Sequence, residues 1–167
     1  MANTYKLISS VTVGSGGAAT IGFTSIPATY TDLLLNYSGR VDQTGNVRQV
    51  DISFNSNTSN FSGLYFQGNG STLIQGLLAR YAGNVTGTSA TASTFGSTSI
   101  YIPNYASSNN KAFSVDFTTE NNATTADAGF IAGLWSNSAA ITSVTLTPAG
   151  GNFVQYSTAY LYGISNA

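Results

Sequence analysis

The sequence contains no cysteine and no histidine, and these two absences remove much of the chemistry that proteins use. Without cysteine there is no disulfide framework, no thiolate nucleophile and no soft-metal site. Without histidine, no side chain has an ordinary pKa near neutrality that would suit general acid and base catalysis. We therefore expect a chain with no catalytic residues, no cofactor and no metal, and hence not an enzyme.

Charge is also scarce. Charged residues make up 7% of the chain and the net charge is −1, whereas about a quarter of a typical soluble domain is charged. The five basic residues are scattered along the sequence, at Lys6, Arg40, Arg48, Arg80 and Lys111. Nucleic-acid binding relies on clustered cations, so we expect no nucleic-acid partner. A surface of uncharged Asn, Ser and Thr keeps repulsion between neighbouring copies weak.

Long hydrophobic runs are missing as well. Nowhere do 18 or more apolar residues follow one another, so no membrane-spanning helix is expected. Residues 1–13 lack a basic segment followed by an apolar run, the pattern of a signal peptide. We expect neither membrane insertion nor secretion by signal peptide.

What the sequence does contain is strict alternation of apolar and polar residues, at 19–24, 50–55, 113–118 and 160–164. A half-buried β-strand needs an apolar residue at every second position, because successive side chains point to opposite faces. Many short strands in a chain of this size favour two packed sheets, since a single open sheet leaves one apolar face wet. We predict one all-β domain over residues 1–167, an antiparallel, jelly-roll-like β-sandwich.

Three clusters of turn-forming residues punctuate this pattern, and 14–17, 67–70 and 148–151 are each expected to close a hairpin. Residues 83–98 are almost all Gly, Ser, Thr and Ala, a composition that buries little area and favours a long loop or arm. Residues 73–81 have some helical spacing, but the Gly inside the segment favours a strand or irregular structure.

Two segments are apolar on both faces, 33–35 and 130–135, which predicts central strands covered by protein on each side. One of the covers is expected to be a second subunit, because monomers seldom expose large apolar patches. Trp135, the only tryptophan, is interpreted as a core or subunit-contact anchor. The candidate oligomer or core contacts are Trp135, Leu34, Phe130, Ile131, Tyr160 and Tyr162.

Carboxylates and polar loops suggest two weaker alternatives. Asp51 and Asp116 both fall on the polar side of alternating strands, so a pair on one sheet face is conceivable, but solvated or salt-bridged surface groups are the favoured interpretation. Residues 42–46 and 121–127 offer oxygen ligands for calcium, yet neither has the regular spacing of a calcium loop. Turn chemistry explains them better.

Three stretches, 19–35 (ATIGFTSIPATYTDLLL), 99–105 (SIYIPNY) and 157–164 (STAYLYGI), resemble small virion structural proteins of tailed bacteriophages, especially aquatic phages. The resemblance implies a β-sandwich subunit that oligomerises, commonly as a trimer. It further implies a place in the virion, assembled in the host cytoplasm, as a capsid decoration or cement protein or as part of a tail fibre. The implied partners are the major capsid protein or other virion proteins, and no site residues carry over.

Two alternatives stay open. The first is a receptor-binding module of a tail fibre that grips host polysaccharide with residues 65–70 and 104–110, since aromatic rings can stack on sugars. The second, of lower weight, is a cellular carbohydrate-binding or adhesin domain, which would ordinarily carry a signal peptide or a linker to a catalytic partner.

Overall fold

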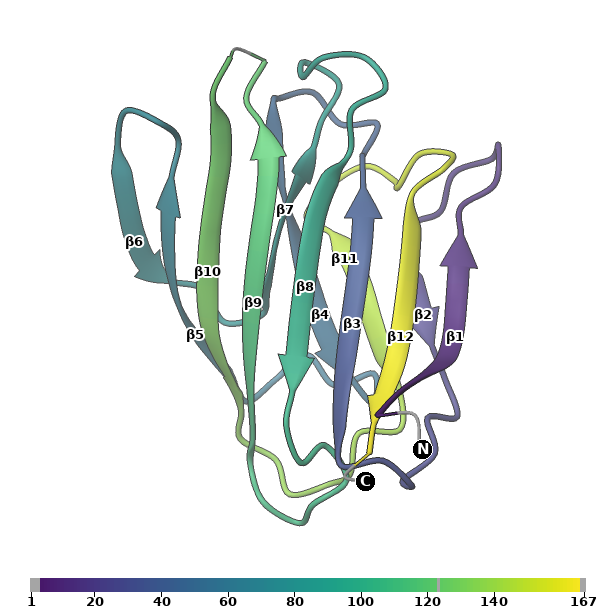
Figure 1. The fold of residues 1–167 in the computed structure, drawn as a ribbon. Coiled ribbons are helices and arrows are strands. Elements are labelled where there is room, and N and C mark those ends of the chain that lie inside the picture. The colour runs from purple at the N-terminus through teal and green to yellow at the C-terminus, as the bar shows by residue number, and fades with distance from the viewer. Residues whose placement is uncertain (1–3, 123, 166–167) are drawn as a thin grey trace.

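The computed structural model describes residues 4–122 and 124–165, which form twelve β-strands in two antiparallel sheets (Figure 1). The larger sheet runs from edge to edge as β1 (Tyr5–Thr12), β12 (Thr158–Ile164), β3 (Asp32–Gly39), β8 (Gly96–Ile102), β9 (Lys111–Glu120), β10 (Ala126–Trp135), β5 (Phe61–Gly68) and β6 (Leu73–Leu77). The smaller sheet runs as β2 (Ile21–Phe23), β11 (Val144–Pro148), β4 (Val47–Phe54) and β7 (Tyr81–Thr86). Among the described residues, no helix has the length and hydrophobicity to span a membrane.

The two sheets lie face to face, with the larger one in front in Figure 1, so the predicted all-β sandwich is confirmed. The jelly-roll topology is not confirmed, since a jelly roll divides eight strands between its sheets whereas eight and four strands are present here. The alternating segments around residues 21, 52, 115 and 162 lie in β2, β4, β9 and β12, as predicted.

One hydrophobic cluster fills the space between the sheets. Val50, Ile52 and Phe54 of β4 face it from the smaller sheet, and Val115 of β9 and Ile131 of β10 face it from the larger one; each side chain is at most 1% exposed. The intervening polar residues point outward, because side chains alternate along a strand. The sandwich is therefore held together by the period-two pattern visible in the sequence.

Trp135 lies in an aromatic group at one end of this core. Its ring centroid is 5.5 Å from that of Phe54 and 6.0 Å from that of Phe61, and Phe113 packs edge-on to Phe54 at 5.7 Å. The Trp135 side chain is 1% exposed. Of the two predicted roles, Trp135 is therefore a core residue, because its buried side chain cannot reach a second subunit within this fold.

The prediction of a long loop over residues 83–98 is wrong at both ends. Residues 83–86 belong to β7, which is buried along its whole length, and residues 96–98 belong to β8. The small residues allow close approach of the sheets: a Cβ on Gly83, whose φ is +98°, would stand 3.0 Å from the Cβ of Phe117. Only residues 87–95 form a loop, and Arg40 anchors it by donating to the Thr91 carbonyl at 2.8 Å.

Of the three predicted hairpins, only the middle one exists. β5 and β6 pair directly, and Asn69 accepts the backbone N–H of Thr72 at 2.8 Å in the turn between them. Residues 14–17 and 148–151 instead carry the chain between the sheets, because β1 pairs with β12 and β2 pairs with β11. Residues 73–77 form β6, which confirms the non-helical prediction for the start of 73–81.

Candidate assembly surface

The outer face of the larger sheet, the side turned away from the smaller sheet, carries most of the exposed apolar side chains. Strand register places one transverse row of residues side by side across all eight strands. We call this the apolar row, and it consists of Leu7, Tyr162, Leu34, Tyr101, Ser114, Ala132, Leu64 and Leu77. None of its members is charged, and Leu77 is 81% exposed.

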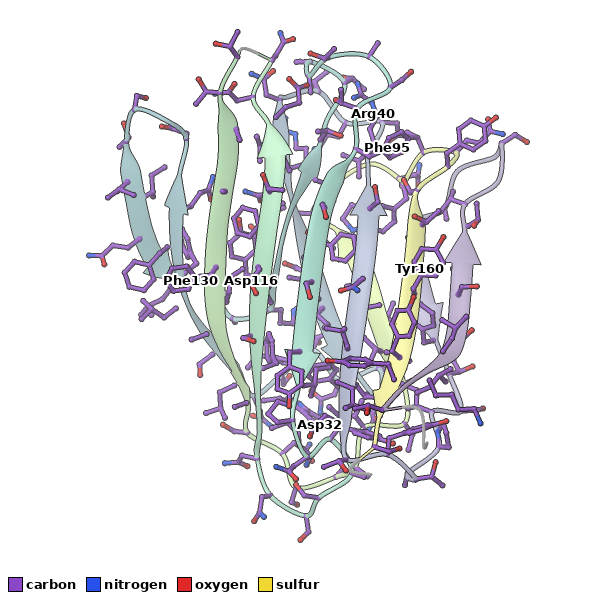
Figure 2. All side chains as sticks on the ribbon, in the orientation of Figure 1. Asp32, Arg40, Phe95, Asp116, Phe130 and Tyr160 are labelled. Carbon is purple, nitrogen blue, oxygen red and sulfur yellow. The ribbon has the colours of Figure 1, made fainter. Side chains whose placement is uncertain are left out.

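A second row lies two residues from the apolar row on the other strands and three residues from it on β1, and it adds aromatic rings to the same face. Phe66 and Phe130 stack there with centroids 5.2 Å apart, and Tyr160 lies towards the other edge. Figure 2 shows Phe130, Asp116 and Tyr160 on this face, with Asp116 paired beside Phe130. Phe130 is 54% exposed and Tyr160 40%. These values are high for large apolar side chains, which normally find a partner.

The predicted contact residues divide between the two sides of the larger sheet. Leu34 and Tyr162 lie in the apolar row, and Phe130 and Tyr160 lie in the second row. Ile131 and Trp135 point the other way, into the core. The sequence prediction therefore named four surface candidates and two core residues as one set.

Sequence reasoning missed four large apolar members of the row, Leu7, Tyr101, Leu64 and Leu77, which come from β1, β8, β5 and β6. The alternation of Leu64 and Phe66 was a usable signal, because it places both on one face of a strand. Leu77 was harder to identify, because its spacing of four residues from Leu73 also fits one face of a helix. Neither segment reveals its neighbours, which come from distant parts of the chain.

β3 and β10 are interior strands of the larger sheet, as their doubly apolar sequences predicted. The predicted cover on the outer side is not supplied by the described part of this chain, since Phe130 of β10 is more than half exposed.

In the apolar row, Tyr101 donates its hydroxyl to Asp32 Oδ2 at 2.7 Å, and this hydrogen bond raises the pKa of Tyr101. Its ring is thereby oriented by a polar contact at the end of the sheet.

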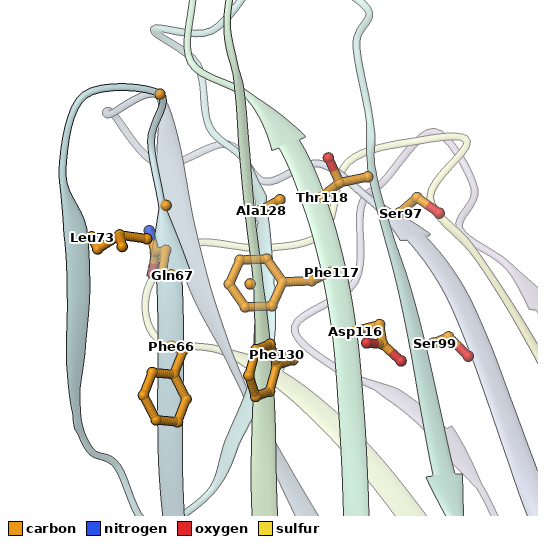
Figure 3. A pocket seen from close by; sticks show the side chains of 13 residues that line it. Phe66, Gln67, Leu73, Ser97, Ser99, Asp116, Phe117, Thr118, Ala128 and Phe130 are labelled. Atoms are coloured by element: carbon orange, nitrogen blue, oxygen red, sulfur yellow. The ribbon is translucent and has the colours of Figure 1, made fainter.

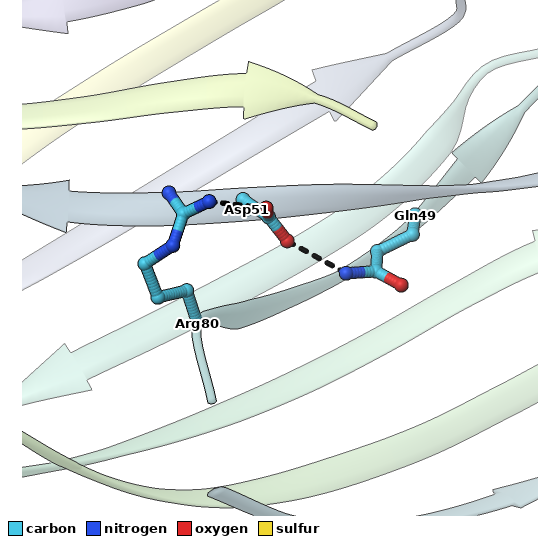
Figure 4. Close-up of polar contacts among 3 residues, drawn as sticks. All are labelled: Gln49, Asp51 and Arg80. Carbon is cyan, nitrogen blue, oxygen red and sulfur yellow. Dashed lines mark hydrogen bonds and ion pairs between the residues drawn. The ribbon is translucent and has the colours of Figure 1, made fainter. Parts of the chain in front are cut away.

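The outer face of the smaller sheet is different in character. Gln49 and Asp51 of β4 point outward there, and Gln49 Nε2 donates to Asp51 Oδ1 at 2.6 Å (Figure 4). Arg80 forms an ion pair with the other Asp51 oxygen at 2.8 Å. Thr145 and Thr147 of β11 occupy neighbouring outward positions. This face is polar and internally bonded, so the apolar outer face of the larger sheet is the candidate contact surface.

A shallow groove of about 740 Å³ crosses the outer face between β8 and β6. Phe66, Phe130 and Leu73 line it towards β6, while Asp116 beside Phe130 and Ser99 beyond it supply polar atoms (Figure 3). Aromatic rings beside hydroxyl and carboxylate groups can hold a ligand that has both apolar and hydrogen-bonding surfaces.

The two loops predicted to grip polysaccharide do not meet. Residues 66–68 and 70 line the groove near the turn that joins β5 to β6. Residues 104–110 connect β8 to β9 at the opposite end of the sandwich and contribute nothing to the groove (Figure 1). The two segments lie towards opposite ends of the larger sheet, so a single site cannot use both.

The structure also tests the predicted roles of the carboxylates. Asp51 and Asp116 lie on different sheets, so they form no pair, and Asp51 is salt-bridged as the favoured interpretation held. Asp42 accepts the backbone N–H of Asn152 at 2.6 Å, and this bond lowers the pKa of Asp42, which agrees with turn chemistry. Among residues 4–122 and 124–165, no group of three His, Cys, Asp or Glu side chains is arranged to hold a metal ion.

No protein-family model matches the chain, and no curated protein matches it.

Proposed function

We propose that this chain is a non-enzymatic structural protein of a bacteriophage particle, a capsid decoration or cement protein. In this role, the outer face of the larger sheet binds other copies of the chain, and the resulting oligomer binds the major capsid protein. The observation that carries the proposal is the uncharged apolar row, which crosses all eight strands and whose side chains are partly or fully exposed in the isolated chain.

The size of the outer face supports this role. Neighbouring strands lie about 4.8 Å apart and rise about 3.3 Å per residue, so eight strands of about eight residues present roughly 1,000 Å². A standard protein interface covers about 800 Å² on each partner. The face is therefore large enough for one specific interface, and burying its leucine and aromatic side chains contributes about 25 cal/mol per Å² of apolar area.

The proposed mechanism is mechanical. Each subunit buries its apolar row and the rings of the second row against neighbours, and the added contact area resists outward pressure on a shell. The low charge of the chain favours dense packing, because copies meet without strong Coulomb repulsion. The resemblance to tailed-phage virion proteins supports the particle as the location and a trimer as the oligomer.

The test of assembly uses the purified chain and two matched lysine variants. Leu64→Lys places a charge in the apolar row, and Thr145→Lys places the same charge on the polar outer face of the smaller sheet. Native mass spectrometry at micromolar concentration should find the same oligomer for wild type and Thr145→Lys, and a smaller species for Leu64→Lys. A folded, monomeric wild type would overturn the assembly role.

The virion location has its own test. Proteomic mass spectrometry of purified particles from a phage that encodes this chain should detect it at a copy number comparable with the major capsid protein. Its absence from the particles would refute the location, whatever its oligomeric state.

A second candidate function is a tail-fibre receptor-binding module for host polysaccharide. The groove favours it, because the exposed, stacked rings of Phe66 and Phe130 line it together with the polar side chains of Ser99 and Asp116. A glycan array should then show binding that Phe130→Ala abolishes and Tyr160→Ala, outside the groove, preserves. A cement protein would bind no glycan on the array.

A further inference from the structure

The two edges of the larger sheet are β1 and β6, and they differ in how they are protected. An exposed edge strand offers unpaired backbone groups to other chains, and proteins usually blunt it with charge, proline or a bulge. β1 carries Lys6 and a register shift between Leu7 and Ser9. β6 has the sequence LIQGL, with no charge and no proline, and it pairs with β5 in unbroken register. β6 is therefore an unprotected edge.

The backbone groups that β6 presents to solvent follow from its pairing with β5. Leu78 donates its N–H to the Gly63 carbonyl at 3.0 Å, and Asn69 donates to the Thr72 carbonyl at 3.3 Å. In an antiparallel ladder, hydrogen-bonded positions alternate along the strand. Even-numbered residues of this strand thus face β5, and the N–H and C=O groups of Leu73, Gln75 and Leu77 face outward.

We propose that β6 pairs antiparallel with β6 of a second copy about a two-fold axis at Gln75, which joins two larger sheets into one. This inference rests on the proposed assembly function and names one of its contacts. The three outward-facing residues of each copy would exchange backbone hydrogen bonds with those of the other. Such a contact is isologous, because both copies use the same surface.

The side chains of β6 are arranged symmetrically about Gln75, which is what pairing with an identical strand requires. Leu73 and Leu77 lie on the same face, are 89% and 81% exposed, and would stand opposite each other across the axis. On the other face, Ile74 would stand opposite Gly76 of the second copy. Tyr65 already covers Gly76 within its own chain, so Ile74 would meet that ring.

Electrostatics also favours a second copy as the occupant. No charged residue occurs in residues 52–79, which include β5, β6 and the turn between them. Like charges directly opposite across a strand pair are destabilising, and this pairing has none. A two-fold contact at this edge does not compete with the outer face, so it would link oligomers built on that face into larger assemblies.

Cysteine cross-linking tests the pairing directly, because the chain has no cysteine of its own. Gln75→Cys would place two thiols on the axis, with Cα atoms about 5.5 Å apart, a separation that a disulfide spans. Lys6→Cys on the opposite edge is the matched control. Under mild oxidation, or with a short bis-maleimide, Gln75→Cys should form covalent dimers at least tenfold faster than Lys6→Cys. Equal rates would overturn the pairing.

Gln75→Pro separates this inference from the proposed function. Proline removes a backbone N–H that faces away from β5, so the hairpin and the outer face should remain intact, as circular dichroism would check. The native mass of Gln75→Pro should fall to half that of wild type or less. If wild type is an oligomer that Leu64→Lys disrupts but Gln75→Pro leaves unchanged, and Gln75→Cys does not cross-link, the β6 pairing is wrong and the assembly role stands. A monomeric wild type would remove the assembly role itself.

Discussion

Replacing Trp135 with alanine tests whether the aromatic end of the core stabilises the fold or a subunit contact. Trp135 is 1% exposed and stacks on Phe61 with an interplanar angle of 25°, while Phe54 meets it at 65°. Truncation at this position would leave a cavity bounded by rings from β4 and β5. We therefore expect the substitution to act on folding and not on assembly.

The expected magnitude follows from burial. Truncating a buried Trp or Phe to Ala costs about 3–5 kcal/mol, because transfer and cavity terms add. Among the described residues, the buried Trp135 indole N–H has no hydrogen-bond partner, so no hydrogen bond is lost with it. Trp135→Phe removes this unpaired donor while keeping a ring, and it should cost less than about 2 kcal/mol.

Urea unfolding followed by far-UV circular dichroism measures both variants, since the only tryptophan is the residue changed. Phe130→Ala is the surface control, because Phe130 is 54% exposed; it should cost less than about 1 kcal/mol. If Trp135→Ala lowers the free energy of unfolding by less than about 1 kcal/mol, or if it dissociates an oligomer whose subunits remain fully stable, the placement of Trp135 in the core is refuted.

Two pH-dependent predictions follow from buried titratable groups. Burial raises the pKa of both Tyr37 and Tyr81, whereas an unfolded tyrosine ionises near pH 10. The contribution of these neutral hydroxyls to the free energy of unfolding should therefore be complete below about pH 10 and fall above it. Urea midpoints measured between pH 7 and 11 would show the fall. Tyr37→Phe should flatten that fall, and an unchanged slope would contradict the assignment. Burial also raises the pKa of Asp127, although Gln67 donates to it at 3.0 Å, so its stability contribution is present at low pH and lost as the carboxyl ionises. Asp127→Asn should therefore be more stable than wild type at pH 7, by a margin that shrinks towards pH 3.5; a constant margin would show that ionisation of Asp127 is not the cause.

The sheet interior was the most predictable part of the molecule. Val50, Ile52 and Phe54 alternate with polar residues in the sequence, and all three are fully buried. Leu34 and Phe130 stood out because each lies in a segment that is apolar on both faces, and each proved to be on the outer face of a central strand. Period-two burial is a local property, so a single strand reveals it.

The segment 83–98 shows where composition misleads. Its small residues suggested a loop that buries little area, but Val85 is fully buried, and a Cβ on Gly96 would lie 3.1 Å from the Val85 Cα. Small side chains were required because β7 packs closely against the larger sheet. How closely β7 packs depends on strands that are distant in the sequence, so the composition of residues 83–98 alone could not predict it.

The sequence alone determined that the chain forms alternating strands, that it lacks the groups for histidine or cysteine chemistry, and that its surface is nearly uncharged. Only the tertiary structure decided which strands are neighbours, and therefore that Leu7 and Leu77, from opposite edges, belong to one apolar row. The physical reason is that alternation sets which side chains share a face within a strand, whereas pairing between distant strands sets which faces join into a surface.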